Sequence, residues 1–190
     1  MIYHTDIFGN ELRVGDKILT SFTYAGASVV SIAEVSSVGT TSIQATAKMH
    51  DIKNPDCYSH IKKDWTVYHC YKISKEDWGL DFANFDIYMK NRNLKSKILF
   101  EITGRELRSG DPVLVFNRKG SLEDTKIGIV ISDTQVFIGD KVERNRHVFL
   151  LEHLKENELA EYHKLTKLYF PKTKQSYKYF SDKTFKLNFK

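Results

Sequence analysis

The sequence predicts a mainly β fold with short helices, built as two tandem antiparallel barrels that are each followed by a helical segment. Two observations predict this architecture. A fifteen-residue segment recurs at an offset of 95 residues, and each copy is followed by short runs rich in Val, Ile and Thr that Gly-containing turns separate. Short β-branched strands joined by such turns are typical of small, strongly bent antiparallel barrels.

The repeat is the strongest pattern in the chain. Asp6–Thr20 (DIFGNELRVGDKILT) and Glu101–Val115 (EITGRELRSGDPVLV) agree at eight of fifteen positions, where unrelated segments agree at roughly one. The shared pairs are Ile7/Ile102, Gly9/Gly104, Glu11/Glu106, Leu12/Leu107, Arg13/Arg108, Gly15/Gly110, Asp16/Asp111 and Leu19/Leu114. A tandem duplication explains this agreement, so we expect two domains, residues 1–95 and 96–190.

The predicted strands follow the two copies. In the first copy we expect strands at Lys17–Phe22, Val29–Val38, Thr41–Thr46 and Thr66–Ile73. In the second copy we expect them at Pro112–Phe116, Lys126–Ser132, Gln135–Ile138 and His147–Leu151. The first copy is longer between its third and fourth strands, which predicts a surface loop inserted at about residues 47–62.

Helical spacing follows each set of strands. Ser74-Lys75-Glu76-Asp77 has the form of a capping box, and Trp78, Phe82, Phe85 and Met89 come after it at helical spacing. A second helix is predicted at Lys155–Leu168, which ends before Pro171. Beyond it, the alternation of aromatic residues with lysines predicts a hairpin between Tyr177–Phe180 and Thr184–Lys190.

The net charge of +5 is unevenly distributed along the chain. Residues 1–95 are neutral overall, and residues 96–163 carry −2. Residues 164–190 carry +7, because they contain eight lysines and a single acidic residue, Asp182. Aromatic residues are interleaved with those lysines. Since lysines neutralise phosphates and rings stack on bases, this composition favours a nucleic-acid partner; a solvated basic tail is the alternative.

The sequence contains no recognised catalytic motif: no Gly-rich phosphate loop ending in Lys-Ser/Thr, no Gly-x-Ser-x-Gly and no His-Glu-x-x-His. The recurring carboxylates favour a structural role because a repeated fold repeats its turns. We expect Asp16 and Asp111 to accept backbone hydrogen bonds there, and Arg13 or Arg108 to pair with the neighbouring Glu. The chain is therefore expected not to be an enzyme and to need no cofactor.

One cluster could hold a metal ion. His50, Cys57, His60, His69 and Cys70 offer five possible zinc ligands within 21 residues. His69 and Cys70, however, are neighbours in a predicted strand and would point to opposite faces. We therefore expect no metal site and favour a core cysteine with solvated loop histidines, with a zinc site as the alternative.

Two further patterns bear on where the protein acts. No apolar run approaches the length of a membrane span, and the first residues lack the basic and apolar segments of a signal peptide. Two cysteines are too few for a disulfide framework and fit a reducing compartment. We expect a cytoplasmic protein without a membrane partner.

The repeated phrase Gly-Asn/Arg-Glu-Leu-Arg-x-Gly-Asp, together with Gly128-Ile129-Val130, resembles SH3-like barrels of the KOW and Tudor type. Similar openings occur in phage-encoded barrels of the YopX type. Two such units in a chain rich in Lys, Tyr, Phe and Asn are similar to small accessory proteins of T4-like phages, which include a DNA-binding, nucleoid-compacting protein. The resemblance implies SH3-like barrels and a binding function in the host cytoplasm or nucleoid; the first copy departs from the KOW pattern at Ala33.

We therefore expect a non-enzymatic, phage-type accessory or nucleoid-associated protein that binds duplex DNA in preference to RNA, with little sequence preference. The alternative is a protein-interaction module that modulates host transcription or the nucleoid, for example through RNA polymerase. The predicted nucleic-acid contacts are Lys164, Lys167, Lys172, Lys174, Lys178, Lys183, Lys186, Lys190, Tyr177, Tyr179, Arg118, Lys119, Arg144 and Arg146.

Overall fold

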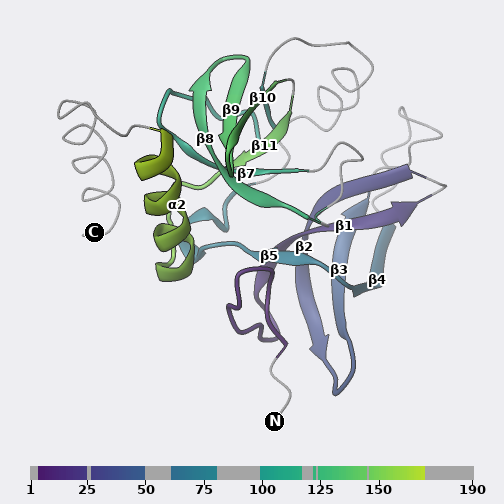
Figure 1. Ribbon diagram of the computed structural model, residues 1–190. Helices are drawn as coiled ribbons and strands as arrows, with labels where there is room; N and C mark the ends of the chain where they lie inside the picture. Colours follow the sequence, from purple (N-terminus) through teal and green to yellow (C-terminus); the bar gives the residue numbers. More distant parts are fainter. Residues whose placement is uncertain are drawn as a thin grey trace. The chain divides into compact units, whose positions relative to one another are not determined.

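The structure is a computed structural model that describes residues 4–24, 27–49, 61–80, 99–116, 122, 124–144 and 146–169. The chain divides into two compact units. Unit 1 comprises Met1–Asn93 with Asn117–Asp124, and unit 2 comprises Leu94–Phe116 with Thr125–Lys190. Each unit is built on its own β-sheet (Figure 1).

Unit 1 contains a five-stranded antiparallel sheet. Its strands are β1 (Lys17–Tyr24), β2 (Ala27–Val38), β3 (Ile43–Met49), β4 (Ile61–Val67) and β5 (Cys70–Lys72), in the spatial order β4-β3-β2-β1-β5. Cα atoms of β1 and β4 come within 8 Å of each other although two strands lie between them. The sheet is therefore curled into a half-barrel.

Unit 2 repeats this arrangement. Its antiparallel strands are β7 (Pro112–Val115), β8 (Lys126–Ser132), β9 (Gln135–Ile138), β10 (Lys141–Arg144) and β11 (His147–Leu150), in the order β10-β9-β8-β7-β11. The two-residue β6 (Phe100–Glu101) adds to β11 in parallel. Corresponding strands of the two units hold the same places, and β2 and β8 even share a register shift, after Val35 and after Val130. The duplication seen in the sequence is thus a duplication of topology.

Most predicted strands are confirmed, with two corrections. The predicted strand Thr66–Ile73 is two strands, because the chain leaves the edge of β3 at Val67 and joins β1 at Cys70. In unit 2 the prediction missed β10, whose sequence KVER contains a single apolar residue and lacks the expected strand pattern. This strand forms because each of its residues is paired with β9.

The helices differ between the units. The predicted Lys155–Leu168 helix is confirmed as α2 (Glu156–Tyr169). After the first sheet, the described residues contain only a one-turn 3-10 helix, η1 (Lys75–Asp77), so within the described part of the chain an α-helix follows the second sheet only. Phe82, Phe85 and Met89 of the predicted first helix, the centre of the 47–62 insertion and the Tyr177–Phe180/Thr184–Lys190 hairpin lie outside the described residues.

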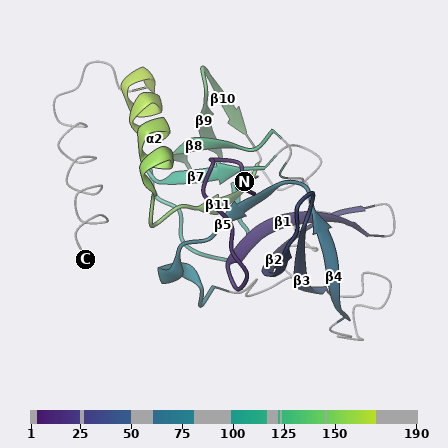
Figure 2. The ribbon, with the colours of Figure 1, turned by 90° about the horizontal axis from the view of Figure 1, so that it is seen from below.

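Each unit has its own apolar core. In unit 1 the core includes Ile18, Val35 and Ile43 on the concave side of the sheet. In unit 2 it includes Val113, Val136 and Val148. The other side of the second sheet is covered by α2, which packs along β8 and β9 (Figure 2). No helix among the described residues is long and apolar enough to cross a membrane.

Unit 1 also contains a residue from the second repeat. Leu122 lies in the connection between β7 and β8, yet it belongs to the first unit. Its side chain is buried, and its backbone N–H donates to Ser21 Oγ on β1 at 3.2 Å. The boundary between the units therefore does not coincide with a single point of the sequence.

The turns before β1 and before β7 are the same down to their hydrogen bonds. Gly15 and Gly110 have φ values of 89° and 93°, which glycine adopts without steric cost. The following carboxylate accepts the backbone N–H of the arginine three residues earlier, at 2.8 Å for Asp16 and 2.7 Å for Asp111. The predicted structural role of these carboxylates is confirmed, as are the Arg13–Glu11 and Arg108–Glu106 pairs.

A second, buried carboxylate closes each unit. Asp6 accepts hydrogen bonds from the backbone N–H groups of Phe8 and Asn10 and from that of Lys72 on β5. Glu101, 95 residues later, accepts from the backbone N–H groups of Thr103, Arg105 and Leu150, the last of them on β11. In both units one carboxylate thus joins the opening segment to the last strand of the sheet.

Packing explains why the first copy has Ala33 where the second has Gly128. A Cβ atom on Gly128 would lie 2.7 Å from Val136 Cγ2 and 2.9 Å from Val115 Cγ2. At the corresponding places unit 1 has the smaller Ala45 and Thr20. The three positions therefore hold a similar total side-chain volume in the two units. Unit 2 has one glycine and two valines there, and unit 1 has two alanines and one threonine.

Replacing the Glu101 carboxylate should destabilise unit 2 strongly. In Glu101→Gln, a buried amide NH₂ must face backbone donors, and Arg105 loses the nearer of its two carboxylate partners. We expect a loss of about 2–4 kcal/mol in the free energy of unfolding. The matched control is Glu106→Gln, whose side chain is 78% exposed, with an expected loss below about 0.5 kcal/mol. Urea unfolding followed by circular dichroism measures both, and equal midpoints would contradict the role assigned to Glu101.

Gly128→Ala should cost about 1–3 kcal/mol of stability because the added methyl group overlaps two valines. Val136→Ala should recover part of that cost by making the space that Ala45 leaves in unit 1. A double-mutant cycle measured by urea unfolding tests this, with an expected favourable coupling above about 0.5 kcal/mol. Strict additivity of the two substitutions would show that the packing argument is wrong.

Candidate nucleic-acid interface

Helix α2 is capped at its start and is held on the rest of unit 2 in its middle and at its end. At its start Glu158, whose side chain is fully buried, accepts the backbone N–H of Lys155 at 3.0 Å and pairs with Lys155 Nζ at 3.0 Å. In the middle, the Tyr162 hydroxyl donates to the carbonyl of Gly110 at 2.6 Å. At its end the ring of Tyr169 lies 4.8 Å from that of Phe137 on β9. These contacts fix which side of the helix faces solvent.

Tyr162 is an anchor and not an acid–base group. Burial, together with the charge of Asp111, raises the pKa of Tyr162 above its ordinary value. The phenol therefore stays protonated at neutral pH and keeps its hydrogen bond to Gly110.

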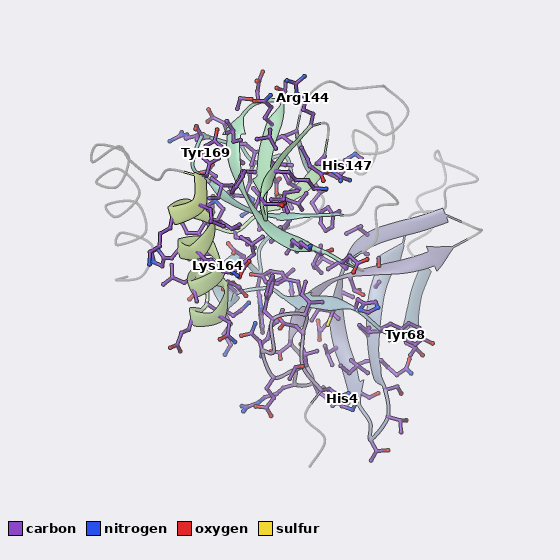
Figure 3. All side chains as sticks on the ribbon, viewed as in Figure 1. His4, Tyr68, Arg144, His147, Lys164 and Tyr169 are labelled. Carbon is purple, nitrogen blue, oxygen red and sulfur yellow. The ribbon has the colours of Figure 1, made fainter. Side chains whose placement is uncertain are left out.

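Two of the predicted lysines lie on the exposed side of α2. Lys164 and Lys167 are exposed, whereas Tyr162 and Leu165 on the opposite side are buried. Figure 3 shows Lys164 pointing away from the sheet. Lys167 lies in the last turn of the helix, where the helix dipole favours a positive charge. Both ammonium groups are thus in position to meet an anionic partner.

The two predicted arginines near β10 differ sharply. Arg146 has only 12% of its side chain exposed and forms an ion pair with Glu143, which also accepts from Lys141 Nζ at 2.9 Å. The hydrogen bond from Lys141, with the contribution of Arg146, holds the pKa of Glu143 below its ordinary value. Arg146 is therefore already neutralised by a carboxylate of the same chain.

Arg144, in contrast, is exposed at the end of β10 (Figure 3). With its amide oxygen turned toward Arg144, Gln135 accepts from Nε at 3.1 Å and from Nη2 at 3.0 Å. An amide orients the guanidinium without cancelling its charge. Arg144 consequently keeps a full positive charge in a defined orientation.

Arg144 shares one face of unit 2 with an aromatic ring. Side chains alternate along a strand, so Arg144 lies on the same face as Val142, which is paired with Phe137. Phe137 in turn contacts Tyr169 of α2. We call this surface, formed by Arg144, Val142, Tyr169 and the exposed lysines of α2, the α2 face. It combines exposed cations with the half-buried ring of Tyr169, the residue types that the sequence predicted for nucleic-acid binding.

The remaining predicted contacts lie outside the described residues. These are Arg118, Lys119, Lys172, Lys174, Tyr177, Lys178, Tyr179, Lys183, Lys186 and Lys190. Sequence reasoning did not select Tyr169 and Gln135 as members of the site. The place of Gln135 beside Arg144 follows only from the pairing of β9 with β10. Tyr169 could have been selected from the sequence, because it is the first aromatic residue of the basic segment 164–190.

The structure separates two members of the possible zinc cluster. His69 is exposed between β4 and β5, whereas Cys70 is 3% exposed in the core of unit 1. Burial, and to a lesser degree the charge of Asp6, raises the pKa of Cys70 to about 12. The thiolate that zinc requires is therefore disfavoured at this position, as expected for a core cysteine. His50, Cys57 and His60 lie outside the described residues.

A comparison of the chain with protein-family models, with curated proteins and with solved structures finds no match.

Cys70 should resist thiol reagents in the native protein. With a pKa of about 12, only about one thiol in ten thousand is ionised at pH 8, and the core shields it further. In a Cys57→Ser variant, we expect labelling by an aromatic disulfide reagent to be slow in buffer and immediate in concentrated urea. Immediate labelling in native buffer would show that the residue is not a core cysteine.

Proposed function

We propose that this chain is a non-enzymatic nucleic-acid-binding protein that binds duplex DNA with little sequence preference. In this proposal it acts as a phage-type accessory or nucleoid-associated protein in the host cytoplasm. Its contacts are mainly to phosphate, made by the α2 face and by the lysines of residues 170–190. Binding of this kind depends on counterion release and carries little sequence information.

The observation that carries the proposal is the separation of charge along the chain. Residues 164–190 carry +7 while the preceding residues carry −2. The described part of this basic segment is the second half of α2, where Lys164 and Lys167 are exposed. A cation that is already paired with a carboxylate of the same chain, as Arg146 is, would contribute little to phosphate binding.

The topology supports a binding module. The order β4-β3-β2-β1-β5, repeated as β10-β9-β8-β7-β11, is the order expected for the SH3-like barrels of KOW and Tudor type that the repeated phrase resembles. Barrels of this size present loops and sheet faces to macromolecular partners. The proposal therefore assigns both units an SH3-like fold with a binding role.

A protein-interaction module is the second candidate. The observation that favours it is the net charge of −2 over residues 1–163, because a broad basic face on the body is not expected from that composition. In this case the partner is a host protein such as RNA polymerase. A pull-down from nuclease-treated lysate separates the candidates: a stoichiometric protein partner supports the second, and loss of every partner supports the first.

Affinity for a mixed-sequence duplex should fall steeply with salt. Contacts to about five phosphates give a log–log slope of the binding constant against salt near −4 to −5, with weaker binding to RNA. Fluorescence anisotropy with labelled duplex DNA, single strands and RNA at several salt concentrations measures this. Deleting residues 171–190 should weaken binding sharply, and an unchanged affinity with the fold intact would exclude these residues from the interface.

Charge reversal on α2 tests the described part of the interface. Lys164→Glu with Lys167→Glu should make the salt slope shallower by about two contacts. The matched control is Arg13→Glu with Lys75→Glu in unit 1, which changes the net charge equally at two other exposed positions. If both double variants weaken binding equally, only net charge matters and the α2 face is not the interface.

A further inference from the structure

The guanidinium of Arg144 has a fixed orientation on the α2 face. Arg144 is paired with Gln135 across strands β10 and β9. The Gln135 amide oxygen, turned toward Arg144, accepts from Nε at 3.1 Å and from Nη2 at 3.0 Å. The two exposed lysines of α2 carry ammonium groups, which act as point charges and have no plane to orient. Arg144 therefore differs from them in the kind of contact that it can make.

The bonds to Gln135 use only one edge of the guanidinium. Nε and Nη2 both donate to the same amide oxygen, and the edge formed by Nη1 and the second hydrogen of Nη2 takes no part in these bonds. Arg144 is exposed (Figure 3), so this outer edge is accessible to a partner. It offers two parallel N–H donors in a plane that Gln135 holds.

The group that orients Arg144 is uncharged. A carboxylate also orients a guanidinium, as Glu143 does for Arg146, but it neutralises the positive charge at the same time. Gln135 supplies orientation and leaves the charge of Arg144 for a partner. An oriented guanidinium with its full charge suits a pair of acceptor atoms that lies close to phosphates.

Two groups of duplex DNA offer such a pair of acceptors: two oxygens of one phosphate, and O6 and N7 of guanine in the major groove. A phosphate attracts a cation from many directions, and the lysines of α2 already meet that need. A guanine edge requires donors in its own plane. Val142, which is 47% exposed and lies on the same face as Arg144, adds an apolar contact that suits a base edge better than a phosphate.

The place of Arg144 in the fold allows a contact with a base. Strand β10 is the last strand at its end of the second sheet and is paired with β9 alone. The major groove of B-DNA is wide enough to admit two strands of this kind. The end of β10 can therefore approach the base edges while α2 meets the phosphates.

We propose that Arg144 contacts guanine in the major groove, where its outer edge donates to O6 and N7, and that Gln135 is the residue that positions it. The inference rests on the proposed function, because it presumes that the α2 face binds duplex DNA. It adds one base contact to phosphate contacts that carry no sequence information. The resulting preference is small and is limited to guanine.

The test compares two duplexes of the same G·C-rich sequence, one of which has 7-deazaguanine in place of every guanine. This replacement removes the N7 acceptor and leaves the phosphates and the base pairing in place. Fluorescence anisotropy with the full chain should show that the modified duplex binds about three- to tenfold more weakly. The salt slope should be the same for both duplexes, because the number of phosphate contacts does not change.

Three variants separate orientation from charge. Arg144→Lys keeps the charge but loses the paired donors, so it should bind both duplexes equally with an unchanged salt slope. Gln135→Ala leaves the charge in place and releases the guanidinium, so it should reduce the discrimination and also leave the salt slope unchanged. The matched control is Lys164→Ala, which should weaken binding to both duplexes by the same factor.

Equal affinity of the wild-type chain for the two duplexes would overturn the proposal and leave the proposed function standing. Discrimination that persists in a folded Arg144→Lys variant would show that another residue contacts guanine. Full discrimination in a folded Gln135→Ala variant would refute the positioning role of Gln135. A wild-type chain that binds neither duplex would overturn the proposed function, and this inference with it.

Discussion

The fold depends on a buried carboxylate that accepts backbone hydrogen bonds from two distant segments. Asp6 and Glu101 each stand before the first long strand of their unit, where the chain has few strand partners for its N–H groups. A buried N–H without an acceptor is costly, and one ionised side chain offers enough lone pairs for several of them. Because the acceptor also takes an N–H from the last strand, it determines where the sheet closes. Aspartate in one unit and glutamate in the other serve this purpose, so the hydrogen-bond geometry has persisted while the residue changed.

The sequence allowed most strands and the repeated turn to be predicted, because apolar runs and a positive-φ glycine leave local patterns. It did not allow β10 to be predicted, since the pairing with β9 and the ion pairs of Glu143 stabilise that strand from outside its own residues. The break at Tyr68 and His69 was hidden for a similar reason: the surrounding residues favour extended backbone throughout, and only the change of partner strand divides them. The role of Asp6 was also not predicted, because its partner on β5 is 66 residues away.

The candidate site shows what a count of charges leaves out. Arg144 and Arg146 are indistinguishable in the sequence, yet one is oriented by an uncharged amide and the other is paired with a carboxylate. The proximity of Tyr169 to β9 was visible only in the tertiary structure.

Leu122 has a consequence for how the protein is made. The ribosome delivers the chain from its N-terminus, and the first sheet is complete in sequence once Lys72 has emerged. The buried leucine that bonds to Ser21 emerges 50 residues later, when the first strand of the second sheet has already been synthesised. The packing of the first unit is therefore finished only after part of the second repeat has been synthesised, so the first half of the chain depends on the second during biosynthesis.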